Sequence, residues 1–333
     1  LKYLAALTYL YLISSVYIRL NLEEDQGFCI LSALCFIYKR KQESWMKPAV
    51  KAFFDEPTST LTYLVYDSVS KDAILIDPVL NFNPNSGKVS FESLDKVESY
   101  IKKEGLRLRY SLETHAHADH LSGALFLKKR FPGIKVGVGK NITLVQKHFK
   151  EVFNLKELKT DGSQFDLLLE DGQVIEAGSL SLKVIFTPGH TPACSSYLVG
   201  DALFTGDTLF MPDFGTARVD FPDGSAHKLY DSIQNKIYVL PDDTRVFVGH
   251  DYMPGGRELK YETTIGEQKE ANVQISKNVS EQEYTKFRSE RDSKLDAPRL
   301  LLPSIQVNID AGRLPSSEDN GTKYLKLPLK LEE

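Results

Sequence analysis

Four short apolar segments in this sequence each end in a histidine or an aspartate. The side chains at these ends are His115, His190, Asp207 and His250, spread over roughly 135 residues of chain. Apolar residues that alternate with polar ones predict strands with one buried face. Strand ends that share one edge of a sheet lie together in space, although they are distant in sequence. We therefore expect an α/β fold that brings these four side chains to one rim.

The remaining chain alternates between strand patterns and helix patterns. Strands are expected at residues 61–66, 73–77, 106–114, 135–138, 174–176, 180–186, 196–199, 202–205 and 245–248. Helices are expected at residues 90–104, 122–130, about 229–237 and 280–295. Ser90 is the expected N-cap of the first helix, and Ser280 with Glu283 is a capping box for the last. Beyond Tyr252 we expect only this one amphipathic helix and then an apolar run at 300–309.

A dense group of metal-binding residue types begins at the first of these strand ends. Residues 114–120 read THAHADH, and His115, His117 and Asp119 share the alternation of an extended segment. Asp119 is followed directly by His120. A single histidine at a strand end is usually a structural residue, but seven ligand-type residues in one pattern predict a metal site. Imidazole and carboxylate together suit zinc, iron or manganese better than calcium or magnesium.

Charge and cysteine content exclude several classes of protein. Lys plus Arg is 41 and Asp plus Glu is 45, so a net charge of −4 gives no reason to expect nucleic-acid binding. The cysteines are Cys29, Cys35 and Cys194, too few and too scattered for a disulfide framework. We therefore expect a reducing compartment, cytoplasmic or mitochondrial, and Cys194 as a small buried side chain. His148 and His227 lack the strand-end context and are expected to be structural.

The first 45 residues differ from the rest of the chain. Residues 1–18 are apolar and rich in Tyr and Leu, which is at the lower limit of length for a membrane span. We interpret 1–45 as an extension outside the fold: a membrane anchor, a targeting segment or a gene-model artefact. Membrane attachment is expected only if this segment is a genuine anchor. The domain is expected at 46–333, with a C-terminal extension from about 253.

These motifs resemble the metallo-β-lactamase superfamily, whose pattern is H-x-H-x-D-H followed by His, Asp and His at wide spacings. Within it, the chain looks most like the glutathione persulfide dioxygenases of the β-lactamase hydrolase-like branch. The segments that carry this closer likeness are FFDEPTST (53–60), LETH (112–115), TPGHTP (187–192), GDTLF (206–210), TARVDF (216–221), GHDY (249–252) and QVNI (306–309). The resemblance implies an αββα sandwich, with two mixed sheets face to face and helices on the outer faces.

The resemblance also implies a site. Its hydrolases hold two zinc ions, which would use His115, His117 and His190 for one metal, and Asp119, His120 and His250 for the other, with Asp207 bridging. Its persulfide dioxygenases hold one iron(II) at the counterparts of His115, His190 and Asp207. Following the closer family, we expect one Fe(II) per chain, with His117, Asp119, His120 and His250 orienting the ligands and water.

Arg218 and Tyr252 resemble the residues of the family that contact glutathione, and Arg257 is a weaker candidate. The alternative for Arg218 is an ion pair with Asp220 or Asp223. The expected reaction is oxidation of glutathione persulfide by O₂ and water to sulfite and glutathione.

Two other functions compete with this one. The first is a dinuclear-zinc thioester hydrolase of the glyoxalase II type, whose separate helical C-terminal domain is not expected here. The second is a non-catalytic metal-binding sulfur sensor or tethered interaction protein. Self-association as a homodimer is left open.

Overall fold

The computed structural model describes residues 47–329 and 331. The extension predicted for residues 1–45 lies outside these described residues. Within the described part, none of the helices is both long enough and apolar enough to cross a lipid bilayer.

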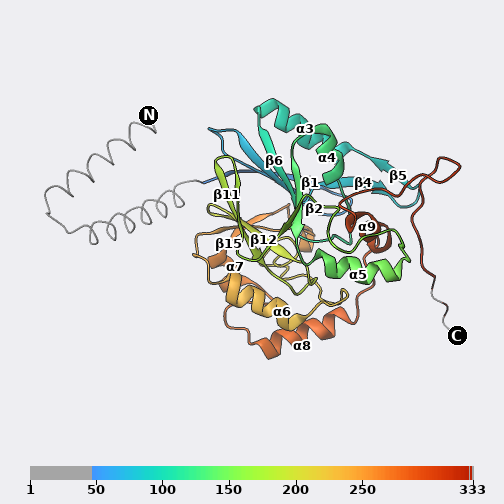
Figure 1. The fold of residues 1–333 in the computed structure, drawn as a ribbon. Coiled ribbons are helices and arrows are strands. Elements are labelled where there is room, and N and C mark those ends of the chain that lie inside the picture. Colours follow the sequence, from blue (N-terminus) through green and yellow to red (C-terminus); the bar gives the residue numbers. More distant parts are fainter. Residues whose placement is uncertain (1–46, 330, 332–333) are drawn as a thin grey trace, which may run out of the picture. The chain divides into compact units, whose positions relative to one another are not determined.

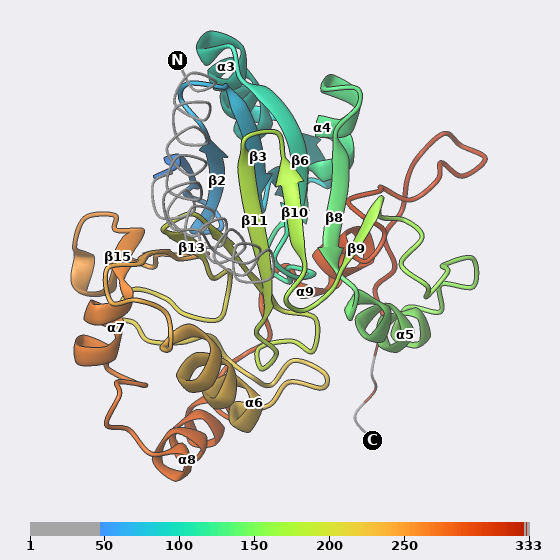
Figure 2. The same ribbon diagram turned by 60° about the vertical axis from the view of Figure 1, so that its left-hand side comes forward.

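Two six-stranded sheets form the centre of the described part. Sheet 1 has the order β1-β2-β3-β6-β8-β9, and Figure 2 shows β2, β3, β6 and β8 side by side. Its strands are β1 (Ala49–Asp55), β2 (Thr60–Tyr66), β3 (Asp72–Ile76), β6 (Arg107–Glu113), β8 (Lys135–Gly139) and β9 (Leu167–Leu169). Sheet 2 runs from β10 to β15 in chain order. Its strands are β10 (Val174–Ala177), β11 (Leu180–Phe186), β12 (Ser195–Val199), β13 (Ala202–Phe204), β14 (Arg245–Phe247) and β15 (Glu262–Thr264). A small third sheet joins β5 (Lys88–Ser90), β4 (Val79–Asn83) and β7 (Leu121–Ser122) in that order.

Sheets 1 and 2 are mixed and pack face to face. In sheet 1 the pair β1–β2 is antiparallel, whereas β3–β6 and β6–β8 are parallel. In sheet 2 the pair β13–β14 is parallel and its neighbours are antiparallel. Tyr63 of sheet 1 lies between the sheets, with its ring centroid 5.3 Å from Phe204 and 5.5 Å from Phe247 of sheet 2. Its hydroxyl donates to the Val248 carbonyl at 2.6 Å, so the aromatic core carries no unpaired phenol.

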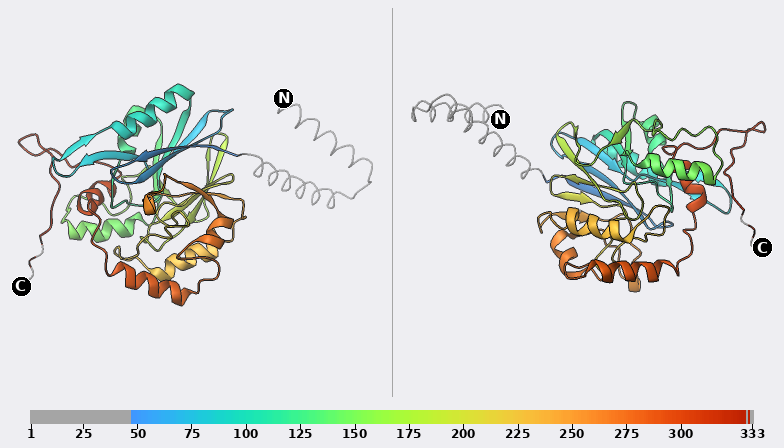
Figure 3. Two further views of the ribbon diagram at one scale, coloured as in Figure 1. Left: turned by 180° about the vertical axis from the view of Figure 1, so that it is seen from behind. Right: turned by 60° about the horizontal axis from the view of Figure 1, so that its bottom comes forward.

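Helices cover both outer faces, as Figures 1 and 3 show for α3 and α4 on one side and α6 and α8 on the other. The helical segments are α3 (Glu92–Glu104), α4 (Ala124–Arg130), α5 (Ile142–Val152), α6 (Ala226–Asp231), a π-helical turn (Ser232–Ile237), a 3₁₀ turn (Pro254–Gly256), α7 (Ile265–Ala271), α8 (Glu281–Asp292) and α9 (Leu301–Asn308). Helix α3 buries Leu94, Val97 and Ile101 in a cluster that includes Leu64 and Leu75 of sheet 1. The layered arrangement expected from the sequence is therefore present.

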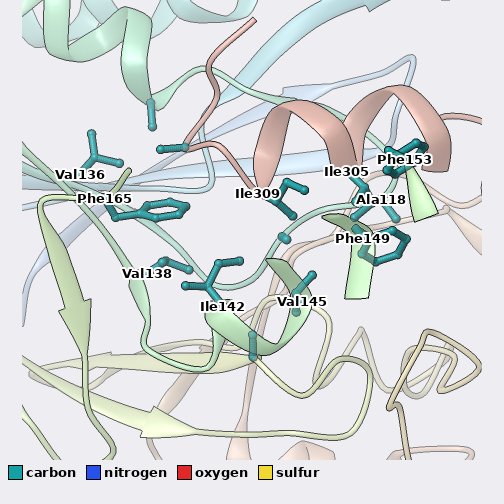
Figure 4. Close-up of a cluster of buried hydrophobic side chains, with 14 residues drawn as sticks. Ala118, Val136, Val138, Ile142, Val145, Phe149, Phe153, Phe165, Ile305 and Ile309 are labelled. Carbon is teal, nitrogen blue, oxygen red and sulfur yellow. The ribbon is translucent and has the colours of Figure 1, made fainter. Parts of the chain in front are cut away.

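A second hydrophobic cluster joins the C-terminal region to the edge of sheet 1 (Figure 4). Val136 and Val138 of β8 pack there with Phe149 of α5, with Ile305 of α9 and with Ile309, which directly follows α9. The segment of α9 was expected only as an apolar run. The helix is buried along most of its length and lacks a polar face, so its sequence shows no helical period.

Several local predictions were wrong. Ser90 is the last residue of β5, where it pairs with Asn81, so α3 begins two residues later at Glu92. Leu121 and Ser122 form β7, and α4 therefore starts at Ala124. The region beyond Tyr252 holds α7, α8 and α9 instead of a single helix. The capping box of Ser280 and Glu283 at the start of α8 is confirmed.

A chain that begins at Met46 should fold and bind metal like the full chain. The reason is that the first strand starts at Ala49 and the sandwich is built from residues that follow it. Thermal unfolding of the two chains, followed by circular dichroism, should give midpoints within about 2 °C. A matched truncation that begins at Thr60 removes β1, which pairs with β2 along its whole length, and should lower the midpoint strongly. Insolubility of the chain that begins at Met46 would contradict this expectation.

Candidate metal centre

The strand ends singled out in the sequence meet at one edge of the sandwich. His115 follows β6, His190 follows β11, Asp207 follows β13 and His250 follows β14. All four side chains are buried. The ligand-type atoms of His115, His190 and Asp207 lie within 4.8 Å of one another. Residues from three separate strand ends can therefore hold one metal ion.

Asp207 lies at the centre of this group. Its Oδ2 is 3.9 Å from Nε2 of His115 and 3.7 Å from Nε2 of His190. Its Oδ1 is 3.3 Å from Nε2 of His250, which is also 3.3 Å from Oδ2 of Asp119. His250 thus bridges two carboxylates.

A second group of side chains that could bind a metal lies beside the first. Atoms of His117, Asp119 and His120 also lie within 4.8 Å of one another. The rings of His115 and His117 are 4.1 Å apart between centroids, and those of His117 and His120 are 4.2 Å apart. The structure therefore brings together all seven metal-binding candidates of the sequence.

Two carboxylates beside this site were missed by the sequence analysis. Nε2 of His117 is 3.0 Å from Oδ1 of Asp77 and 3.4 Å from Oε2 of Glu113. Asp77 directly follows β3, so it obeys the same strand-end pattern that identified the other residues. Glu113 is the last residue of β6, and Ser122 donates a hydrogen bond to it.

Hydrogen bonds to the second ring nitrogen fix the orientation of three histidines. Nδ1 of His190 donates to the carbonyl of Arg218 at 2.7 Å, and Nδ1 of His120 donates to the carbonyl of Leu121 at 3.1 Å. Nδ1 of His115 donates to Oγ1 of Thr114 at 3.0 Å, because that hydroxyl gives its own proton to Asp77 at 2.9 Å. In each ring Nε2 is left with its lone pair, as a metal ligand requires.

Burial and charge set the protonation states of the site. Burial, reinforced by the nearby positive charge of His117, lowers the pKa of His120 to about 4 and that of His115 well below its usual value. Burial opposes ionisation of Asp207, but His250, His115 and His190 outweigh it and hold the pKa of that carboxyl well below its usual range. Burial likewise opposes the charge on His250, yet Asp207 and Asp119 raise its pKa to about 9.

The residues present fit a divalent transition metal. Nε2 of His115, Nε2 of His120 and Nδ1 of His117 are buried and have no hydrogen-bond partner among the described residues, and Oδ1 of Asp207 faces only Nε2 of His250 at 3.3 Å. A buried polar atom without a partner is costly, about 1–3 kcal/mol, and such atoms gathered in one place indicate an ion. Neutral imidazole and ionised carboxylate are the forms that bind metal.

Comparison with known proteins agrees with this geometry. Residues 55–250 match the metallo-β-lactamase superfamily, and this range includes every metal-binding candidate. The chain belongs to the metallo-β-lactamase superfamily.

Relatives within the superfamily carry different names. A β-lactamase hydrolase-like protein of Agrobacterium fabrum is 47% identical over 93% of this chain and 70% of its own length. Glyoxylase B2 of Dictyostelium discoideum is 48% identical over 85% of this chain and 97% of its own. The human mitochondrial persulfide dioxygenase ETHE1 is 35% identical over 61% of this chain and 68% of its own. The crystal structure of ETHE1 from Myxococcus xanthus superimposes with a TM-score of 0.65 at 30% identity, covering 80% of this chain and all of that one.

In this superfamily member a cleft of about 270 Å³ opens onto the metal site. His190 and Asp207 line it together with Tyr252, Arg218 and Arg291. The guanidinium of Arg218 donates to Asp220 and to the carbonyl of Asp296, so the ion pair weighed as its alternative role is present. Arg291, in α8, has no hydrogen-bond or ion-pair partner among the described residues. The sequence analysis missed it because nothing in the helix pattern distinguishes a cleft-facing arginine from a solvated one.

An aromatic wall, formed by Phe210, Phe214 and Tyr252, lines the cleft beside His250. The ring centroids of Phe214 and Tyr252 are 4.8 Å apart, and those of His250 and Tyr252 are 5.6 Å apart in a stacked arrangement. Arg257, the weaker substrate candidate, instead joins the two loops that carry this wall. It donates pairs of hydrogen bonds to Asp213 and to the buried Asp251.

The remaining candidates behave as structural residues. Cys194 is buried, and burial raises the pKa of its thiol to about 12. His227 pairs with Glu281 and thereby connects α6 with α8. The ring of His148 packs edge-on against Phe149, with centroids 5.0 Å apart.

Proposed function

We propose that the protein is an iron(II)-dependent persulfide dioxygenase, which converts glutathione persulfide, O₂ and water to sulfite and glutathione. The observation that carries this proposal is the group of His115, His190 and Asp207 around one point. Two histidines and one carboxylate are the donor set of non-haem iron(II) oxygenases, in which positions stay open for substrate and O₂. Relatives named persulfide dioxygenase and a structural neighbour named ETHE1 support the same reading.

The surroundings of His250 are compatible with a site that holds one metal. Its Nδ1 donates to the carbonyl of Ser59 at 3.1 Å, so its Nε2 faces Asp119 and Asp207 and needs a proton or a metal there. In the metal-free site Asp207 and Asp119 raise the pKa of His250 to about 9, so this nitrogen carries a proton there unless a metal replaces it. The imidazolium then neutralises Asp119, which also accepts a hydrogen bond from Thr60 at 3.2 Å. Asp119 is thereby engaged without a second metal.

The cleft suits a negatively charged thiol peptide. Its mouth offers the positive charge of Arg291, and the aromatic wall provides an apolar side for the sulfur-bearing chain. When bound, iron(II) would supply open coordination positions for the persulfide and for O₂, and would donate electron density to O₂, which is the oxidant of the sulfur. The protein's own residues hold the substrate: Arg291 binds a glutathione carboxylate, and Tyr252 packs along the peptide. A persulfide substrate and a free thiol at Cys194 also fit a reducing compartment, cytoplasmic or mitochondrial.

Metal analysis combined with oxygen uptake tests this function. Protein purified without oxygen should contain about one iron per chain and should consume O₂ only when glutathione persulfide is added. The competing hydrolase would use Asp119, His120 and His250 for a second metal, and the name glyoxylase B2 makes it the natural comparison. Two bound zinc ions, together with hydrolysis of glutathione thioesters and no O₂ uptake, would replace our proposal with that one.

Replacing Arg291 by alanine should raise KM for glutathione persulfide with little change in kcat. A contact with a remote carboxylate is made equally in the ground state and the transition state, so its loss weakens binding alone. A hydrogen bond to a charged group is worth about 1.5–3 kcal/mol, which corresponds to roughly ten- to a hundredfold in KM. The matched control is Lys286→Ala on the same helix, since Lys286 is largely exposed. An unchanged KM in Arg291→Ala would remove this residue from the substrate site.

A further inference from the structure

A single backbone carbonyl sets the orientation of the His190 ring and determines which of its nitrogens can bind the metal. The carbonyl of Arg218 accepts a hydrogen bond from Nδ1 of His190 at 2.7 Å. Because a carbonyl can only accept, this contact places the ring proton on Nδ1 and leaves the lone pair on Nε2. Nε2 of His190 is the atom that faces Asp207, at 3.7 Å from Oδ2. Whatever fixes the Arg218 carbonyl therefore also fixes a ligand of the metal.

Arg218 lies in the loop between β13 and α6 and belongs to no strand or helix. The neighbouring backbone groups are held instead by side chains of α8. The amide of Val219 donates to Oδ2 of Asp292 at 2.8 Å. The carbonyl of Thr216 accepts from Nη1 of Arg288 at 3.0 Å. Asp292 thus holds the peptide that carries the Arg218 carbonyl, and Arg288 holds the chain two residues before it.

The side chains that hold this loop form one buried stripe on α8. Tyr284, Arg288 and Asp292 are spaced four residues apart and are almost completely buried. Arg288 pairs with Asp292, and Oη of Tyr284 lies 2.8 Å from Oγ1 of Thr216. Apolar residues would pack such a face at less cost, because burying a charged pair requires desolvation of both ions. A stripe of this kind points to a positional role.

We propose that Arg288 and Asp292 are positioning residues of the metal centre, which fix the tautomer and direction of His190 through the Arg218 carbonyl. Helix α8 thereby couples the C-terminal part of the chain to the metal. Partners that orient a metal-binding histidine typically contribute about 10- to 100-fold to metal affinity or activity. The inference rests on the metal centre of the proposed function but not on the identity of its reaction.

Cobalt(II) binding to the full chain tests this role without any assay of turnover. The test variant is the double replacement Arg288→Met with Asp292→Leu, since apolar residues of similar volume often replace a buried ion pair without loss of stability. It should remain folded, with a midpoint lowered by the lost hydrogen bonds to Val219 and Thr216, and should bind cobalt about 10- to 100-fold more weakly in competition with a chelator. The ¹⁵N shifts of His190 in the metal-free protein should show a mixture of tautomers instead of the Nδ1–H form. The matched control is Arg245→Met with Asp201→Leu, a double-hydrogen-bonded ion pair that makes no contact with His190.

The outcomes separate this inference from the proposed function. A folded double variant with wild-type cobalt affinity and a pure Nδ1–H tautomer would overturn it, whether or not the wild-type protein oxidises persulfides. If the double variant does not fold, Arg288→Lys decides the question. Lysine keeps a positive charge beside Asp292 but lacks the planar fork that reaches Thr216. Weaker cobalt binding in a folded Arg288→Lys protein supports the role, and unchanged binding with an unchanged tautomer contradicts it.

Discussion

Replacing Asp207 by alanine should empty the metal site and reduce persulfide-dependent O₂ uptake to below about 1% of the wild-type rate. Loss of a residue that only orients a ligand costs about 10- to 100-fold, and loss of a ligand should cost at least the upper limit of that range. Asp207 is the one carboxylate of the group formed with His115 and His190. In the proposed site it would also supply negative charge that offsets part of the charge of the metal.

The structure adds a second reason to expect a large effect. Nε2 of His250 lies 3.3 Å from Oδ1 of Asp207, and Asp207 is the largest charge that raises the pKa of His250 to about 9. Without this carboxylate, His250 should lose its proton nearer to neutral pH. The variant should therefore change the charge of the site in addition to its ligand number. Metal content by mass spectrometry measures the first effect, and an NMR titration of His250 in the metal-free proteins measures the second.

Asp242→Ala is the matched control, because Asp242 is exposed and pairs only with Lys269 among the described residues. It should retain metal and activity. An Asp207→Ala protein that keeps both its iron and its turnover would show that the donor group is wrongly assigned. Asp119 would then be the carboxylate to replace next, since it belongs to the neighbouring group with His117 and His120.

Replacing Gly189 by alanine should destabilise the fold by about 3 kcal/mol, the upper end of the range for overpacked sites. A Cβ atom at this position would lie 2.3 Å from Cβ and 2.4 Å from Cα of Leu229 in α6. The backbone of a helix cannot turn away as a side chain can, so α6 or the loop must move. Because Gly189 precedes His190, a proposed ligand, metal affinity should also fall at least tenfold.

Gly172→Ala provides the comparison for this prediction. Gly172 has a φ of +74°, but a Cβ there would meet nothing within 4 Å. The control therefore carries only the cost of a left-handed backbone, about 1–2 kcal/mol. Chemical denaturation of both variants gives the two free energies of unfolding. A Gly189→Ala protein as stable as the control, with wild-type metal affinity, would show that α6 does not constrain the ligand loop.

The strand-end pattern was sufficient to predict the metal-binding candidates, because a strand's alternation and its terminal residue are both local features of a sequence. His115, His190, Asp207 and His250 were found in this way, and the structure brings them together. The same rule applies to Asp77 after β3, but a lone aspartate in a turn is too common to be singled out. Helix α9 was not predicted for a related reason: a helix that is buried along most of its length lacks the polar face that reveals the helical period.

The sequence by itself determined the class of fold, the superfamily likeness and the set of metal-binding residue types, because each of these follows from periodicity or from a short motif. Only the tertiary structure decided the roles of the arginines. Arg218 and Arg257 are paired with Asp220 and with Asp213 and Asp251, whereas Arg291, which lines the cleft together with Arg218, has no carboxylate partner among the described residues. A long charged side chain takes the partner that folding brings within reach. That partner is fixed by which loops converge, and their convergence depends on contacts between residues far apart in the chain.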